Sequence, residues 1–204
     1  YLKILELSDV FDYIFTFDEE LLKMGDKFVK TPIGTSRIID RHAKIYKKTK
    51  STSMIVSKKK WCVGHKFRHD IVMGFRDPSL VDMWGEAFKP MPQGAKILAL
   101  AEYRYTISVE NWQGDNYFTD KPTDPFRVGT VPVYWGPKNF SKFFNMDGVI
   151  VFETAEELND IIPTLTEKRY QSMLPAIKDN FELVKNWLSM DDTFAKNLKE
   201  TLYE

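Results

Sequence analysis

Residues 105–136 decide how the chain folds, and they read YTISVENWQGDNYFTDKPTDPFRVGTVPVYWG. The first five letters combine β-branched and aromatic residues and are typical of a strand. Residues 119–128 then favour a helix, with Pro122 near its start, where proline is tolerated. Residues 130–135 return to a strand pattern and end at Gly136, where another segment must lie close to the backbone. A strand, a helix and a second strand in this order predict a βαβ unit with parallel strands.

The same alternation continues on both sides of this unit. Further strands are expected at 54–57, 81–85 and 149–152, and further helices at 67–75, 96–102, 140–144 and 155–165. The pattern predicts the α/β class, with a Rossmann-like parallel sheet and flanking helices. In such sheets ligands bind beyond the carboxyl ends of the strands.

Residues 54–165 form the expected central domain, and both flanks have a different character. Residues 1–53 are expected to be a partial N-terminal or connecting segment, with strands at 9–17 and 28–34 around a short helix at 18–24. The basic and polar run 40–53 predicts a linker or surface loop, whose charges are more simply a solvated face than a binding patch. Residues 166–204 are expected to be a helical tail that breaks near Pro175.

Composition and charge exclude several classes of protein. The 204 residues carry 29 Lys and Arg against 29 Asp and Glu, so the net charge is zero, which argues against a nucleic-acid-binding protein that works by bulk electrostatics. No run of about 18 apolar residues occurs, so we expect no transmembrane segment. The single cysteine, Cys62, favours a reducing, cytoplasmic compartment and is expected to be a buried small hydrophobe. Peripheral membrane contact through the aromatic residues of the tail is the alternative reading of their helical spacing.

Two polar stretches follow predicted strands. The first, KKKWCVGHKFRHD at 58–70, places Arg68 near a helix start, where a guanidinium can bind a phosphate; a solvated position on the helix face is the competing interpretation. The second is the loop after residue 109. It supplies a carboxylate suited to sugar hydroxyls and a lysine suited to a diphosphate, together with amides and a phenol. Its candidate ligand-binding residues are Glu110, Asn111, Asn116, Tyr117, Asp120 and Lys121.

The order and spacing of this second stretch resemble a known family. Val109-Glu110-Asn111, then Asn116 to Lys121, then GTVPVYWG at 129–136 are similar to the donor-binding half of the α-1,3/1,4-fucosyltransferases, glycosyltransferase family 10. Arg68, the apolar helix after it and VDMWG at 81–85 are similar to the family's upstream elements. The resemblance covers roughly residues 54–165.

The resemblance implies one donor-binding half of a two-domain GT-B-type glycosyltransferase. It implies transfer of fucose from GDP-fucose to a glycan hydroxyl with inversion, through a transition state of oxocarbenium character. Arg68 and Lys121 would neutralise the leaving diphosphate, so no metal is required. The family places its general base in the other domain, so the catalytic residue stays unknown here. We expect this chain, which begins at Tyr1 and resembles a fragment, to bind donor without transferring sugar.

Departures from the family pattern leave alternatives open. Asp120 stands where the family has Glu, and Pro122 and Pro125 follow where it has helix formers, so the helix start is expected to be distorted. A transferase that uses another GDP-sugar, or a non-catalytic module that binds a nucleotide sugar, fits these changes. No metal site is expected, because His65 and His69 lack a third ligand in the sequence.

Overall fold

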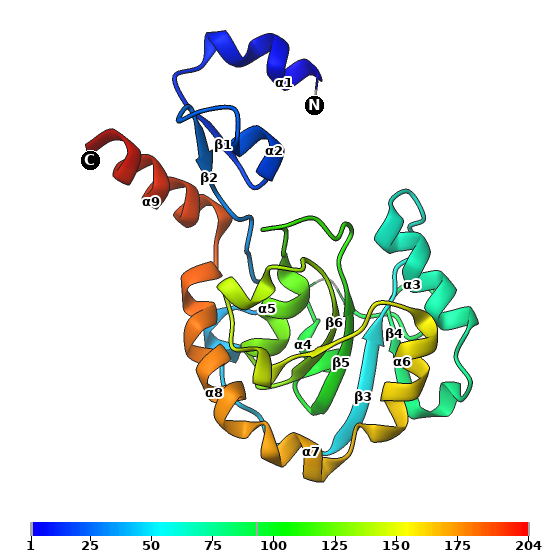
Figure 1. The fold of residues 1–204 in the computed structure, drawn as a ribbon. Coiled ribbons are helices and arrows are strands. Elements are labelled where there is room, and N and C mark those ends of the chain that lie inside the picture. The colour runs from blue at the N-terminus through cyan, green and yellow to red at the C-terminus, as the bar shows by residue number, and fades with distance from the viewer. Residues whose placement is uncertain (1, 93, 204) are drawn as a thin grey trace.

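The computed structural model describes residues 2–92 and 94–203 (Figure 1). A parallel five-stranded sheet forms its centre, in the order β4-β3-β5-β6-β7. The strands span Lys50–Ile55 (β3), Val81–Trp84 (β4), Tyr103–Val109 (β5), Val131–Trp135 (β6) and Ile150–Val151 (β7). The predicted α/β class with a parallel sheet is confirmed.

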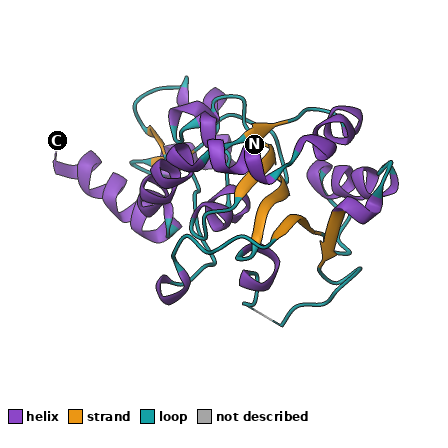
Figure 2. Ribbon diagram, turned by 90° about the horizontal axis from the view of Figure 1, so that it is seen from below, coloured by secondary structure: helices purple, strands orange, loops and turns teal. Residues whose placement is uncertain are grey.

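Helices surround the sheet, as the view from below shows (Figure 2). They span Val63–Met73 (α3), Ile97–Leu100 (α4), Asp120–Phe126 (α5), Ala155–Ile161 (α6), Glu167–Ser172 (α7), Leu174–Leu183 (α8) and Met190–Tyr203 (α9). Short 3-10 turns lie at Asp40–His42, Pro78–Leu80, Phe140–Lys142, Met146–Gly148, Ile162–Thr164 and Val184–Trp187. None of the helices in the described ranges is long and apolar enough to cross a bilayer.

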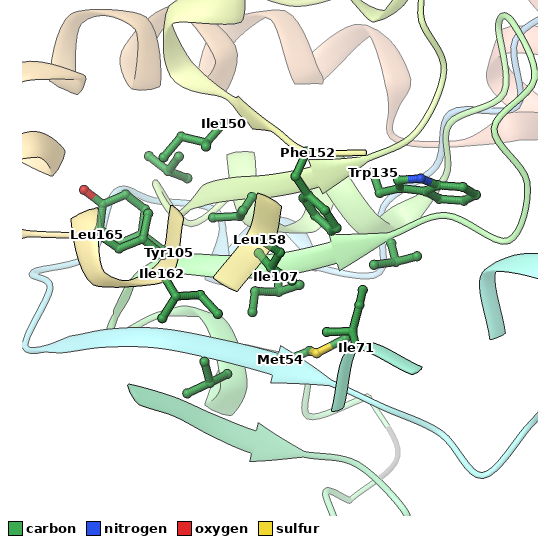
Figure 3. Close-up of a cluster of buried hydrophobic side chains, with 14 of the residues drawn as sticks. Met54, Ile71, Tyr105, Ile107, Trp135, Ile150, Phe152, Leu158, Ile162 and Leu165 are labelled. Atoms are coloured by element: carbon green, nitrogen blue, oxygen red, sulfur yellow. The ribbon is translucent and has the colours of Figure 1, made fainter. Parts of the chain in front are cut away.

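The main core lies between the sheet and helices α3 and α6 (Figure 3). Alternate residues of β5, among them Tyr105 and Ile107, point to this face and pack against Ile71 of α3 and Leu158 of α6. The opposite face is covered by α4 and α5, where Phe126 packs in a cluster of aromatic side chains with Tyr134. Because helices cover both faces of the sheet, nearly every side chain of the central strands β5 and β6 is buried.

Strand β3 corrects the prediction of a linker at 40–53, because it begins at Lys50. The run has no apolar period because two of its polar side chains are buried in the sheet. Ser53 is one of them: its hydroxyl donates to the carbonyl oxygen of Ala99 at 2.6 Å and lies 3.1 Å from the Thr106 hydroxyl oxygen. Buried hydroxyl groups with such partners are as acceptable in a strand as apolar ones.

The N-terminal residues form a small unit above the sheet in Figure 1. It contains α1 (Leu2–Leu7), a 3-10 turn (Ser8–Val10), β1 (Ile14–Thr16), α2 (Glu19–Leu22) and β2 (Phe28–Lys30). Strands β1 and β2 pair in parallel, and Asp18 caps α2 by accepting from Glu20 N and Leu21 N. The two predicted strands and the short helix between them are therefore present, with shorter strands.

The helical tail serves two different parts of the molecule. Helix α8 packs on the central domain, where the Asn180 side chain exchanges two hydrogen bonds of 2.8 Å with the backbone of Asn145. Helix α9 reaches the N-terminal unit: Phe194 contacts Phe15 with ring centroids 4.7 Å apart, and Asn197 Nδ2 donates to Lys30 O at 3.0 Å. Helix α7 ends and α8 begins at Met173, two residues before Pro175, where the break in the helical tail was predicted.

Candidate functional site

The strand order places a crevice between β3 and β5. The chain leaves β3 in one direction to form β4, then crosses back to form β5 on the other side of β3. In an open parallel sheet the loops at such a switch of direction separate, and ligands bind there beyond the carboxyl ends of the strands. A cavity of about 150 Å³ lies at this point. Residues of β3, β5, α3 and α5 line it, together with Lys96 just before α4.

Arg68 lines this cavity from helix α3. The helix begins at Val63, so Arg68 lies in its middle and not at its start, and with 8% exposure it is not on a solvated face. Its Nε and Nη2 donate to the carbonyl oxygen of Val109 at 3.0 and 2.7 Å, and Nη2 also donates to Asn111 Oδ1 at 2.7 Å. Among the described residues no acceptor is recorded for Nη1, so part of the guanidinium remains available to a ligand.

Glu110 follows β5 and is completely buried. Its carboxylate accepts from Thr119 N and Thr119 Oγ1, both at 2.8 Å, and from the Tyr134 hydroxyl at 3.2 Å. Lys121 Nζ lies 3.4 Å from the same carboxylate and donates to Thr119 Oγ1 at 2.9 Å. Burial and the neighbouring Glu110 charge raise the pKa of Tyr134 well above its usual value. Glu110 thus fixes the start of α5 and the position of Lys121.

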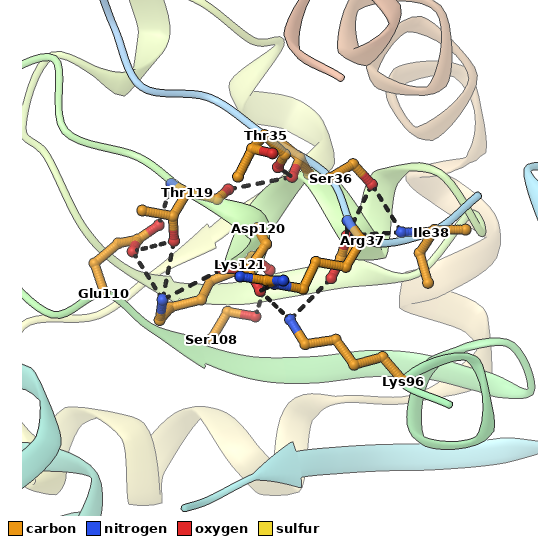
Figure 4. A network of polar contacts seen from close by, with 12 residues as sticks. Thr35, Ser36, Arg37, Ile38, Lys96, Ser108, Glu110, Thr119, Asp120 and Lys121 are labelled. Atoms are coloured by element: carbon orange, nitrogen blue, oxygen red, sulfur yellow. Dashed lines mark hydrogen bonds and ion pairs between the residues drawn. The ribbon is translucent and has the colours of Figure 1, made fainter. Parts of the chain in front are cut away.

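Asp120 lies in a cluster of cations on the other side of the cavity (Figure 4). Its carboxylate accepts from Lys96 and lies 3.4 Å from Arg37 Nε. Burial alone would raise the pKa of Asp120, but the charges of Lys96 and Lys121 outweigh it and hold this pKa well below its usual range. Lys96 also donates to Asp124 Oδ2 at 2.9 Å. Burial would lower the pKa of Lys96, but the two carboxylates more than compensate and raise it.

Asp124 carries this network to the connecting segment before β3. Its Oδ1 accepts from the Ser36 hydroxyl at 2.8 Å and from the backbone nitrogens of Arg37 and Ile38 at 2.6 and 3.3 Å. Sequence reasoning missed Lys96 and Asp124. The available signal was the place of Lys96 at the start of a predicted crossover helix, since such starts lie at the carboxyl edge of a parallel sheet.

Asn116 and Tyr117 lie on the outer side of the loop and do not line the cavity. Asn116 is buried with a φ of 60°, and its Nδ2 donates to Phe17 O at 3.1 Å and to Glu19 Oε1 at 2.6 Å. The Tyr117 ring packs against Phe17 with ring centroids 5.3 Å apart. Of the seven predicted donor-binding residues, the structure brings Arg68, Asp120 and Lys121 to the cavity. Glu110 and Asn111 lie directly behind them, and the other two face the N-terminal unit.

The two prolines from which a distorted helix start is predicted both lie within α5, and the distortion stays a prediction. The helix spans only Asp120–Phe126, with Pro125 inside it, and its N-cap residue Thr119 makes no side-chain cap hydrogen bond. The Thr119 hydroxyl donates to Glu110 instead. No group of three or more His, Cys, Asp or Glu side chains suited to a metal ion occurs in residues 2–92 and 94–203.

Comparison with known proteins identifies the family. The sequence model described as "Glycosyltransferase family 10 (fucosyltransferase) C-term" matches residues 45–185. The chain belongs to glycosyltransferase family 10. The match also confirms the resemblance to the C-terminal half of the family.

Individual relatives of this family 10 chain are fucosyltransferases by name. The human 4-galactosyl-N-acetylglucosaminide 3-alpha-L-fucosyltransferase FUT6 is 30% identical over 90 residues, which cover 43% of this chain and 25% of that protein. The Helicobacter pylori alpha-(1,3)-fucosyltransferase FucT is 39% identical over 69 residues, 32% of this chain and 14% of that protein. The matched region therefore spans a quarter or less of these two relatives.

A solved structure shares the fold. A crystal structure of an alpha1,3-fucosyltransferase with GDP-fucose aligns with a TM-score of 0.60 at 20% identity, covering 95% of this chain and 70% of that one. The fold of the family 10 chain is therefore that of GT-B fucosyltransferases.

Proposed function

We propose that this family 10 chain is the donor-binding half of a transferase that moves fucose from GDP-fucose to a glycan hydroxyl with inversion. The observation that carries the proposal is the cavity at the switch point of the sheet, lined by Arg68, Lys96 and Lys121. Lys96 is paired with Asp120 and Asp124, which also line the cavity, so Arg68 and Lys121 are the cations that suit a ligand with two phosphates. Family membership and the fold shared with a fucosyltransferase crystallised with GDP-fucose support this choice of donor.

Arg68 and Lys121 are assigned to the leaving diphosphate. As the bond between sugar and phosphate breaks, negative charge grows on the phosphate oxygens, and preorganised cations stabilise that charge. Arg68 is held by the end of β5, and Lys121 by Glu110 and Thr119, so neither side chain has to be ordered when the donor binds. Glu110 is then a positioning residue, because its carboxylate is enclosed by protein donors.

Asp120 keeps the identity of the GDP-sugar open as an alternative. Its carboxylate is shorter by one methylene than the Glu of the family pattern, and it already pairs with Lys96. A donor that uses this carboxylate for its hydroxyl groups must share it with Lys96. Donor sugars other than fucose are therefore the second candidate, and a binding module without catalysis is the third.

Nucleotide binding tests the proposal directly. We expect GDP to raise the melting temperature of the chain and UDP and ADP to have little effect, because a ligand of the native state stabilises it by mass action. Lys121→Ala should weaken GDP binding in calorimetry by about 1.5–3 kcal/mol, the contribution of a charge-assisted hydrogen bond. Arg68→Lys should weaken it too, because an ammonium group cannot reproduce the forked hydrogen bonds that hold the guanidinium. Lys178→Ala, an exposed change on α8, is the matched control.

Two results would contradict the proposal. If none of GDP, UDP and ADP shifts the melting temperature, the nucleotide site is wrong. If Lys121→Ala and Lys178→Ala bind GDP equally well, the diphosphate assignment is wrong. GDP release from GDP-fucose with glycan acceptors then separates a transferase from a binding module, and we expect turnover only from a protein that also carries an acceptor domain.

A further inference from the structure

A second cavity, of about 200 Å³, lies beside the donor cavity, and we call it the side pocket. Its walls are residues 55–57, at the carboxyl end of β3, and residues of the loop that follows β4. Ile55 and Ser57 line both the side pocket and the donor cavity. The two spaces therefore adjoin at the end of β3, and one elongated ligand can occupy both.

Two backbone segments lie unusually close together at the side pocket. Val56 N donates to Trp84 O at 2.9 Å, which extends the contact between β3 and β4 beyond the last residue of β3. A Cβ atom on Gly85 would lie 2.2 Å from Val56 O, and the Gly85 φ of 105° is one that favours glycine. Glycine at this position therefore holds the loop after β4 against the end of β3.

The loop after β4 turns back at once, and this turn sets the position of Glu86. Gly85 N donates to Lys89 O at 2.9 Å, and Phe88 N donates to Gly85 O at 3.0 Å, so residues 85–89 form a closed turn. The Lys89 ammonium lies 4.2 Å from the centre of the Trp84 ring, which ties the turn to β4. Glu86 is thus presented to the side pocket by a fixed backbone.

Glu86 is the one carboxylate among the described residues that line the side pocket. Within the described ranges no cation pairs with it, and its Oε2 accepts a long hydrogen bond of 3.4 Å from Lys58 N. Ile55, Val56 and Met91 give the pocket apolar walls. Apolar walls with one available carboxylate suit a flat ring that carries hydrogen-bond donors along one edge.

We infer that Glu86 selects the base of the donor and that the base it selects is guanine. The inference rests on the proposed function, which places the diphosphate beside Arg68 and Lys121 in the adjoining cavity. Guanine carries two adjacent donors, N1–H and the N2 amino group, and one carboxylate can accept from both. Adenine has an acceptor at N1, and uracil has a single donor between two carbonyl groups, so neither can form this pair of hydrogen bonds. Glu86 is therefore a specificity-determining residue.

Three diphosphates test the inference by calorimetry: GDP, inosine diphosphate and inorganic pyrophosphate. Inosine diphosphate keeps N1–H but lacks the N2 amino group, and pyrophosphate has no base. The chain should bind GDP about tenfold more tightly than inosine diphosphate, because a hydrogen bond to a charged group is lost. Glu86→Gln should reduce this ratio to about threefold or less and should leave the affinity for pyrophosphate within about twofold of the wild type.

Two further variants serve as controls. Glu156→Gln removes the same charge from an exposed position on α6 and should keep the full preference for GDP. Met91→Ala should weaken GDP and inosine diphosphate by the same factor, since it removes part of the apolar wall and no polar contact. Pyrophosphate should bind Met91→Ala as tightly as it binds the wild type.

The results that would overturn the inference differ from failure of the donor site. If the wild type binds GDP and inosine diphosphate equally while pyrophosphate competes with both, the diphosphate site stands and Glu86 does not select the base. If Glu86→Gln and Glu156→Gln keep the same preference for GDP, another residue selects the base. If GDP and pyrophosphate both fail to bind, the proposed function is wrong and the inference falls with it.

Discussion

The surroundings of Lys48 predict how the stability of the folded chain depends on pH. The side chain is partly buried below the sheet, and its ammonium group donates to Ala101 O at 2.8 Å, Val128 O at 2.7 Å and Thr130 Oγ1 at 2.8 Å. These three acceptors are neutral, so no carboxylate offsets the loss of water. Burial lowers the pKa of Lys48 from 10.5 to about 7.

The sign of the effect follows from proton binding. Above pH 7 the unfolded chain keeps the Lys48 proton up to about pH 10.5 while the folded chain releases it, so the unfolded state binds more protons and stability rises with pH. A folded pKa of about 7 sets an upper limit of about 3 kcal/mol for the gain between pH 7 and pH 9.5. Since all three hydrogen bonds favour the charged form, we expect a gain of about 1–2 kcal/mol.

Urea unfolding at pH 7, 8 and 9.5 measures this gain. The upper limit of pH 9.5 avoids the titration of the buried tyrosines. Burial raises the pKa of Tyr105 and of Tyr170 to about 12, so these groups lower the stability of the folded state only above about pH 10, where they ionise in the unfolded chain. Lys48→Met keeps most of the aliphatic stem and should abolish the rise. Lys47→Met, at the exposed neighbouring position, should keep it. Equal pH slopes for the wild type and Lys48→Met would refute the reasoning.

Two further predictions concern the site. Lys96 and Lys121 hold the pKa of Asp120 well below its usual range against the effect of burial, so the contribution of Asp120 to stability is present above about pH 4 and is lost as the pH falls. Asp120→Asn should therefore reduce the fall of the urea unfolding midpoint between about pH 5 and pH 3. A midpoint that falls as steeply in the variant as in the wild type would contradict this. Gly64→Ala should lower the melting temperature strongly, because the new Cβ would lie 1.7 Å from Glu110 O, and a variant as stable as the wild type would show that this contact between α3 and the loop after β5 is not tight.

The fold could be predicted from sequence wherever burial follows a period. β-branched and aromatic residues at 103–109 and 131–135 marked two central strands, because both faces of the sheet are covered by helices. Strand β3 was placed too late for the opposite reason, since its first four residues are polar. The hydroxyl of one of them, Ser53, bonds to Ala99 of α4 and Thr106 of β5. Long-range partners of this kind leave no local pattern.

The sequence predicted which residues lie at the site but not which of them form ion pairs with one another. The sequence indicated that Glu110, Asp120 and Lys121 follow a strand end, and the structure places all three around the start of α5. It gave no sign that Lys96, distant in the chain, would pair with Asp120, because that contact depends on the crossover at β3. The predicted domain limits, the metal-free chemistry and the cytoplasmic location stay predictions.

The way the chain crosses between its two parts has a mechanical consequence. It passes from the N-terminal unit to the sheet near Ser36 and returns near Leu188, and the Ser36 backbone nitrogen donates to Leu188 O at 3.1 Å. Phe194 and Asn197 fix α9 to the N-terminal unit, while Asn116 and Tyr117 fix the same unit to the loop after β5. The N-terminal unit and α9 are therefore linked to the central domain both at this crossing and at the loop after β5. Because Arg37 lies next to Ser36 in the chain and 3.4 Å from Asp120, a displacement of the N-terminal unit would be transmitted to a cation beside the donor cavity.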